Sequence, residues 1–368
     1  MFNKISAKQL KYAVSAFIMA SSLLTSHLYF FTENESWLSV LLGFVASFIM
    51  IGIYSALSKR YPGKNLIDIT TAVFGRVLGT GISLFYVFYF LSLSYLNTRN
   101  LGDFIKGSVL LNTPMTIILV FFVLICAMAV RKGPVVMSRY GLLASVICIA
   151  AILINSLLLL NMTEPHNLLP AFNLPLQKYL IGSHFVTMLP FCEIMSFMMF
   201  IPDMQKPEGF GRAMRSGLCI GAAVLVTIVL RDIMVLGQHV VISALPPYST
   251  TRMIDVGDIL TRLEIVYAVI LISLLFFKVS VVYYATVSSV GSLLGKSYRL
   301  FIFIFGALIV LYAEASFPAS SEHTEWLMTA AATYSSFMLL ILPLLTLIVS
   351  WIRGSLKNKP ESYQEAAT

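Results

Sequence analysis

The stretch Leu189–Ser196 (Leu-Pro-Phe-Cys-Glu-Ile-Met-Ser) lies in an apolar run, residues 180–201, that is long enough to cross a membrane. A proline inside a helix removes one backbone hydrogen bond and clashes with the preceding turn. The carboxylate of Glu193 is unfavourable in lipid unless it faces a cavity or a partner. This stretch therefore predicts a membrane-spanning helix with a polar break. The alternative is a simple proline kink in which Glu193 bonds to a neighbouring helix.

A second polar interruption occurs near the N-terminus, in residues 20–27 (Ala-Ser-Ser-Leu-Leu-Thr-Ser-His). Small and hydroxyl-bearing residues crowd the middle and outer half of this apolar segment. Polar residues at membrane depth mark sites of function or of helix contact. A serine-lined contact between helices remains an equal alternative for this segment taken alone.

The composition places the whole chain in a membrane. Of its 368 residues, 58% are hydrophobic and only 11% are charged, whereas an average soluble domain has about 25% charged residues. This composition excludes an ordinary soluble enzyme, a disordered protein and a small disulfide scaffold. The pattern lacks the long alternation of a β-barrel and predicts an all-α polytopic protein. Ten apolar segments are expected at residues 12–31, 37–58, 78–98, 115–130, 140–161, 180–201, 214–243, 263–293, 299–317 and 331–352.

The two interruptions fall in the first and the sixth of these ten spans. Two consecutive halves of five spans each must have opposite topology, because five is odd. Matching breaks in two such halves indicate the binding site of an inverted-repeat transporter. We therefore expect a single transmembrane domain over residues 1–355, with half-repeats at about 11–161 and 180–352. A short cytoplasmic tail is expected at residues 356–368.

The basic residues predict the orientation of the chain. With a cytoplasmic N-terminus, eighteen of the 25 Lys and Arg residues fall on the inner side and five on the outer side. Two more, Arg231 and Lys278, lie within apolar runs. This asymmetry follows the positive-inside rule, so both termini are predicted to be cytoplasmic. It also accounts for the net charge of +8 without any nucleic-acid partner.

Lys278 is the sharpest anomaly, because it lies too far from either end of its span to reach the water. Either it forms a structural ion pair, with Glu193 or Asp232, or it faces a cavity. A cavity lysine would bind a carboxylate, replace a coupling cation or carry a proton. Tyr86 and Tyr89 share one face of the third span and offer their hydroxyls to the cavity or their rings to packing.

Other features point away from catalysis and metal binding. Arg231 and Asp232 are adjacent, so their side chains project about 100° apart and need not pair. We expect this pair near the outer interface. The four cysteines form no CxxC pair and are read as buried hydrophobes. No nucleophile–base spacing or metal-ligand cluster is visible, so we expect neither an enzyme nor a bound cofactor.

The sequence resembles the B-subunit, or permease-like, family of bacterial spore germinant receptors, within the amino acid–polyamine–organocation superfamily. The resemblance covers residues 6 to 355. It is carried, in order, by Ala20–Thr25, Asn97–Arg99, Leu110–Pro114, Leu189–Glu193, and Leu260–Glu264 followed by Phe276–Lys278. One departure is Ser21-Ser22, where the family commonly has glycine. Because serine lacks the conformational freedom of glycine at positive φ, the break is expected to be tighter here.

The resemblance implies a LeuT-like 5+5 inverted repeat with broken helices 1 and 6, and a germinant pocket beside those breaks. It also implies assembly with A- and C-type receptor subunits in the spore inner membrane. The residues expected to bind the ligand are Ser21, Ser22, Leu23, Thr25, Tyr86, Tyr89, Pro190, Phe191, Glu193 and Lys278.

Two functions fit these residues. The first is a germinant-sensing subunit that binds a small polar nutrient, with an amino acid the foremost candidate, and triggers germination with its partners. The alternative is a proton-coupled amino acid permease. Both use one pocket, and a receptor needs only different ligand affinities in two conformational states.

Overall fold

The computed structural model describes residues 4–254 and 263–354. Two of the features discussed above, the tail from residue 356 and the Leu260–Arg262 stretch, lie outside the described residues. The described part of the chain is built from helices and contains no sheet. Its α-helices are α1 (Ala7–Met19), α2 (Thr25–Thr32), α3 (Ser36–Arg60), α4 (Leu66–Phe74), α5 (Arg76–Ser108), α6 (Met115–Lys132), α7 (Pro134–Leu158), α8 (Leu176–Val186), α9 (Phe210–Leu236), α10 (Pro246–Arg252), α11 (Leu263–Leu294), α12 (Ile302–Ala315), α13 (Ser320–Trp326), α14 (Ala332–Ser336) and α15 (Leu342–Ile352).

The prediction of ten membrane crossings is confirmed in these described ranges. Nine continuous helical stretches are long and apolar enough to span a bilayer. The first stretch, Ala7–Arg60, has 54 residues, which is about 80 Å of helix and more than twice the hydrocarbon thickness. It is interrupted at Glu33, whose φ of 47° lies in the left-handed region. The chain therefore crosses twice there, through α1–α2 and then through α3.

Two boundaries differ from the sequence-based expectation by about ten residues. The last span begins at Ser320 and not at residue 331, and the third span continues to Ser108 and not to residue 98. Both added segments carry charged or polar residues, which a hydropathy argument assigns to loops. Tertiary contacts at the two added segments accompany the extensions: Arg99, expected outside the span, is buried within α5 and donates to the Phe317 carbonyl at 2.9 Å, and Asp103 accepts from Ser320 at 2.7 Å.

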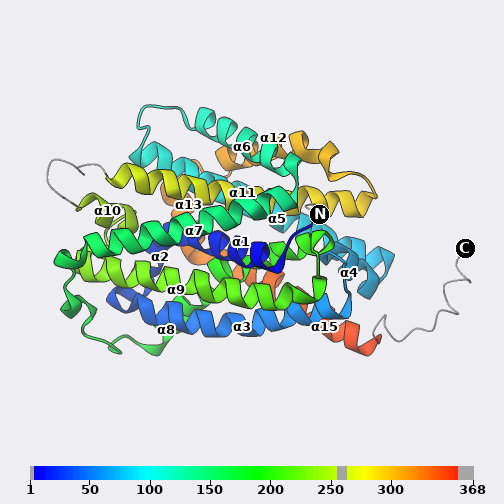
Figure 1. Cartoon of the computed structure of the whole chain (residues 1–368), viewed down its shortest axis with the longest axis horizontal. Helices are drawn as coiled ribbons and strands as arrows, with labels where there is room; N and C mark the ends of the chain where they lie inside the picture. The colour runs from blue at the N-terminus through cyan, green and yellow to red at the C-terminus, as the bar shows by residue number, and fades with distance from the viewer. Residues whose placement is uncertain (1–3, 255–262, 355–368) are drawn as a thin grey trace, which may run out of the picture.

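Helix α1 lies in the interior of the bundle. Every residue from Ala13 to Met19 is buried, so the helix is covered on all sides. It packs mainly against α9 and α7, and both helices run beside it in Figure 1. Helix α11 packs chiefly against α5 and also contacts α6 and α7. The outer helices instead expose large apolar side chains such as Phe121 and Phe303, as expected for lipid-facing positions.

Glycines set the distance between α1 and α9. A Cβ atom at Gly217 would lie 2.6 Å from the Lys11 carbonyl oxygen and 2.7 Å from the Val14 Cβ atom. Gly217 and Gly221, at GxxxG spacing, therefore allow the two helices to pack closely, since a Cβ at Gly221 would lie 2.7 Å from Ile18 Cβ. Gly291 and Gly295 have the same spacing but another role: a Cβ at Gly291 would meet the turn that follows α11 (Lys296 O, Tyr298 Cα), and Gly295, at φ 61°, lies in that turn.

The α1–α9 contact gives a direct test of this packing. Gly217→Ala forces α1 and α9 apart and should lower the melting temperature of the purified protein, with a loss of roughly 1–3 kcal/mol. Gly52→Ala is the matched control, because nothing lies within 4 Å of its added Cβ. That control should be neutral or stabilising by up to about 1 kcal/mol, since alanine favours helix. Equal melting temperatures for the two variants would contradict the packing argument.

Candidate functional site

The break in the first span is a short 3₁₀ segment, Ala20–Leu24, between α1 and α2. Its residues keep right-handed helical dihedrals, and the Thr25 hydroxyl donates to the Ser22 carbonyl at 2.7 Å. The first helix is therefore broken by a change from α-helical to 3₁₀ pitch. A 3₁₀ stretch inside a helix often marks a functional hinge.

The break in the sixth span is larger. Helix α8 widens into a single π-turn, Thr187–Phe191, and then tightens into a 3₁₀ stretch, Glu193–Asp203. Pro190 lies inside the π-turn and has no N–H to donate, so the ordinary α-helical pattern cannot continue. Instead the Cys192 N–H donates to the Thr187 carbonyl at 2.9 Å. Glu193 is the first residue of the 3₁₀ stretch, directly after this change in helical pitch.

The 3₁₀ geometry at the first break points consecutive side chains in three directions. A 3₁₀ helix has about three residues per turn, so neighbours are separated by about 120°. Ser21 faces α11, where it accepts a hydrogen bond from Lys278. Ser22 lines an apolar cavity, and Leu23 lines a second cavity near the C-terminal ends of α2 and α5. One short segment therefore borders three separate environments.

Lys278 and Glu193 form a buried ion pair where the two breaks meet. The Lys278 Nζ atom lies 2.7 Å from Glu193 Oε2 and donates to Ser21 Oγ at 2.7 Å. The side chains of Lys278 and Glu193 are 0% and 2% exposed. The ammonium also lies 5.0 Å from the centre of the Phe17 ring, a favourable cation–π position. Of the two predicted partners for Lys278, the structure selects Glu193.

Asp232 is unavailable to Lys278 because it pairs with its neighbour. Arg231 Nη2 lies 2.6 Å from Asp232 Oδ1, and Arg231 Nη1 donates to Asn155 Oδ1 at 2.7 Å. Asp232 also accepts from Tyr29 and Thr250 at 3.2 and 3.1 Å. The argument that adjacent residues diverge did not predict this direct pair, because a long arginine side chain can bend back to its neighbour.

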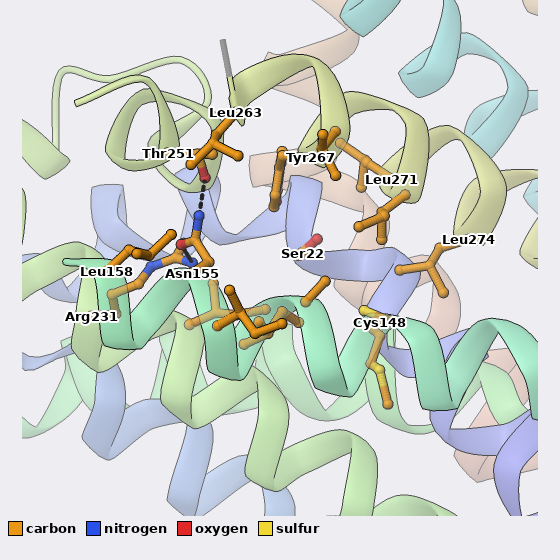
Figure 2. A pocket seen from close by; sticks show the side chains of 17 residues that line it. Ser22, Cys148, Asn155, Leu158, Arg231, Thr251, Leu263, Tyr267, Leu271 and Leu274 are labelled. Carbon is orange, nitrogen blue, oxygen red and sulfur yellow. Dashed lines mark hydrogen bonds between the residues drawn. The ribbon is translucent and has the colours of Figure 1, made fainter. Parts of the chain in front are cut away.

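The Arg231 network closes one end of an apolar cavity of about 170 Å³. Figure 2 shows Arg231 and Asn155 at one end, with Asn155 donating to Thr251, and Ser22 and Leu274 farther along the cavity. Lys278 lies one helical turn after Leu274 on α11, so the cavity wall leads towards the buried ion pair. The wall itself is formed mainly by aliphatic side chains.

The other predicted site residues surround the breaks in different ways. The rings of Tyr86 and Tyr89 pack against aromatic neighbours, Phe90 and Tyr334 respectively. Their hydroxyls are buried and have no hydrogen-bond partner among the described residues. Phe191 packs inward, with its ring 6.5 Å from that of Phe44. Thr25 and Pro190 act on the backbone of the breaks, as described above.

Comparison with known proteins assigns the chain to a family. A family model described as "Spore germination protein" matches residues 4–324. The chain belongs to this family.

Two curated relatives of this spore germination protein match most of its length. It is 29% identical to spore germination protein KB of Bacillus subtilis (strain 168) over 303 residues, which is 79% of each protein. It is 25% identical to spore germination protein YndE of the same organism over 357 residues, covering 95% of this chain and 96% of YndE.

Solved structures show the same fold in membrane transporters. Mhp1, a nucleobase-cation-symport-1 family transporter in a closed conformation, matches with a TM-score of 0.67 and 13% identity, covering 96% of this chain and 84% of Mhp1. A Na⁺-coupled sialic acid symporter matches with a TM-score of 0.65 and 9% identity, covering 91% and 78%. This spore germination protein therefore has the LeuT-like fold with broken helices 1 and 6.

Sequence reasoning missed one polar cluster in this germination protein. Asp103 accepts hydrogen bonds from Ser320 and Arg99 and faces His323 Nδ1 at 3.2 Å. In the sequence, His323 falls between the ninth and tenth apolar segments, and no pattern distinguishes Asp103. Only the spacing of Arg99 and Asp103, four residues apart on one helix, signals part of this cluster. No group of three metal-ligating side chains occurs within residues 4–254 and 263–354.

The buried pair predicts an unequal response to charge removal. Lys278→Met leaves the Glu193 carboxylate buried and unpaired and should cost roughly 3–5 kcal/mol in stability. Adding Glu193→Gln should recover most of that loss. The matched control is Lys178→Met, which removes an exposed pair with Glu33 (2.9 Å) and should cost no more than about 1 kcal/mol. Melting temperatures in one detergent measure all three, and equal losses at Lys278 and Lys178 would contradict the assignment.

Proposed function

We propose that this protein is the germinant-binding membrane subunit of a spore germination receptor, and that it senses a small polar nutrient. The observation that carries the proposal is the Lys278–Glu193 pair with Ser21, held between two broken helices. The names of the curated relatives support the role in germination. The proposal contains no catalytic step.

An amino acid is the nutrient whose charges match this pair best. A zwitterion offers a carboxylate to Lys278 and an ammonium to Glu193. When it enters, each buried charge exchanges one partner for another, so no charge is left unpaired in the protein interior. A neutral sugar would have to separate the pair without replacing either charge, which is costly at low dielectric.

The hydroxyls of Tyr86 and Tyr89 support a ligand in this region. A buried polar group without a hydrogen bond costs about 1–3 kcal/mol. The hydroxyls of Tyr86 and Tyr89 are both buried without a hydrogen-bond partner among the described residues. A polar ligand beside the helix breaks would supply the missing partners.

The rival proposal is a proton-coupled amino acid permease, and the transporter fold favours it. Both proposals use the same site. A permease must also return empty, so it would move its ligand across a sealed membrane, whereas a sensor only shifts between two states. Uptake of radiolabelled ligand by proteoliposomes distinguishes the two.

The proposal extends to partners and location. A pocket without catalytic residues needs other proteins to transmit its signal, so we propose assembly with A- and C-type receptor subunits in the spore inner membrane. Both termini are proposed to be cytoplasmic. Basic residues at the last turns of α3 and α6, Lys59-Arg60 and Arg131-Lys132, support this orientation.

Replacement of Tyr89 separates binding from folding. Tyr89→Phe removes a hydroxyl that has no partner in the described structure, so stability should be kept, whereas the germinant concentration for half-maximal germination should rise about tenfold. Tyr54→Phe is the control, because that hydroxyl donates to the Leu339 carbonyl at 2.6 Å. It should lower the melting temperature without changing the sensitivity of the remaining protein. Unchanged sensitivity in Tyr89→Phe would remove Tyr89 from the site.

Reporter fusions test the proposed orientation. A reporter fused after Gly354 should be active in the cytoplasm, and one inserted after Glu164, in the loop between α7 and α8, should be active outside, because an odd number of crossings separates them. Alkaline phosphatase and green fluorescent protein fusions give opposite signals at the two positions. If the signals at the two positions were exchanged, the topology would be opposite to the one proposed.

A further inference from the structure

A second polar cavity lies apart from the helix-break site. It has a volume of about 520 Å³ and is bordered by α2, the end of α5, residues 241–245 and α13. Its polar lining includes His27, Asn100, Asp103, Ser320 and His323. The Lys278–Glu193 pair does not line it. Leu23 of the 3₁₀ segment belongs to its wall, so the cavity reaches the first helix break from the other side.

The hydrogen bonds of His323 fix its protonation pattern. Its Nδ1 atom lies 3.2 Å from Asp103 Oδ2, and a carboxylate only accepts, so Nδ1 carries the proton. In the neutral ring Nε2 therefore presents a lone pair. His323 is 2% exposed, and Nε2 has no hydrogen-bond partner among the described residues. Asp103 is itself oriented by Ser320 and Arg99, which makes it a positioning residue for this imidazole.

His27 also belongs to the wall of this cavity. The Ser26 hydroxyl donates to the Leu23 carbonyl at 3.4 Å, so its oxygen is free to accept from His27 Nδ1, also at 3.4 Å. His27 Nε2 is then a lone pair as well, and it is buried without a partner in the described ranges. The two imidazoles are close enough for the charge of one to act on the other.

We propose that this cavity is a binding site for a primary ammonium group, held by His323 Nε2 and His27 Nε2. An ammonium has three N–H donors and meets two unpaired acceptors beside Asp103, the one carboxylate among the described residues that line the cavity. The Arg99 guanidinium lies behind Asp103 and donates to the carbonyls of Ala313 and Phe317. The group is carried either by a free amine or by an amino acid on its way to the helix breaks.

The site has a predicted pH dependence. Protonation turns each Nε2 acceptor into a donor and adds positive charge, so ammonium binding should be strongest at alkaline pH, where both rings are neutral, and should weaken in acid. The other charged groups facing the two rings are Asp103 and Arg99. A role for the histidines in packing alone would leave binding unaffected by pH.

Histidine-labelled full-length protein in lipid nanodiscs provides the test. Nuclear magnetic resonance of the five imidazoles is followed at pH 8 while methylammonium is added. We expect a saturable shift of the Nε2 signals of His27 and His323, and none with tetramethylammonium, which has no N–H donor. If glycine competes with methylammonium, amino acids are a source of the ammonium group. If glycine does not compete, free amines are the source.

Two variants and one control sharpen the result. His323→Phe and His27→Phe keep an aromatic ring against Phe317 and Phe185, respectively, and each should weaken methylammonium binding at least about tenfold. His166→Phe, at an exposed position in the loop between α7 and α8, should leave it unchanged. The proposal would be overturned if tetramethylammonium shifted the Nε2 signals as much as methylammonium does. It would also be overturned if those signals changed with pH but not with added methylammonium. Both outcomes can be measured on the unsubstituted protein, even if one variant fails to fold.

Discussion

The buried Lys278–Glu193 pair is the interaction on which the arrangement of the core depends. Two charges removed from water are stable in a protein interior only when they are paired and further solvated by polar groups. Lys278 finds Glu193 at 2.7 Å, Ser21 at 2.7 Å and the ring of Phe17. These partners come from the first and the sixth spans, and Lys278 itself lies on α11. The pair therefore joins both broken helices to a third that remains continuous.

The same constraint makes this region suitable for recognition. Opening a charge pair that is enclosed by apolar helices is costly unless the incoming molecule replaces both charges. Under the proposed function, the pair would therefore favour a zwitterion over neutral nutrients of similar size. Binding would also alter the contacts among three helices at once, which is how a small ligand can shift a conformational equilibrium. The family assignment and the transporter fold are both compatible with such a shift.

The 3₁₀ segment at the first break places three neighbouring side chains in three different environments. The segment that contains Ser21 and Ser22 stays helical with 3₁₀ pitch, so that the successive side chains of Ser21, Ser22 and Leu23 face the ion pair, the apolar cavity and the second cavity. A change in the pitch of this one segment would move all three contacts together. The outer histidine cavity and the central ion pair are thereby connected through Leu23, without any direct contact between their charged groups.

The sequence by itself determined the membrane class, the ten crossings and the positions of the two breaks. These follow from local properties: the length of apolar runs, a proline in a helix and polar residues at membrane depth. It also identified Lys278 and Glu193 as anomalies, because an isolated charge in an apolar run is visible without a fold. Only the tertiary structure decided between Glu193 and Asp232 as the partner of Lys278, and only it joined Asp103 to His323, which lie 220 positions apart. Pairing depends on how helices pack against one another, and the apolar residues that govern packing are too alike in sequence to specify which faces meet.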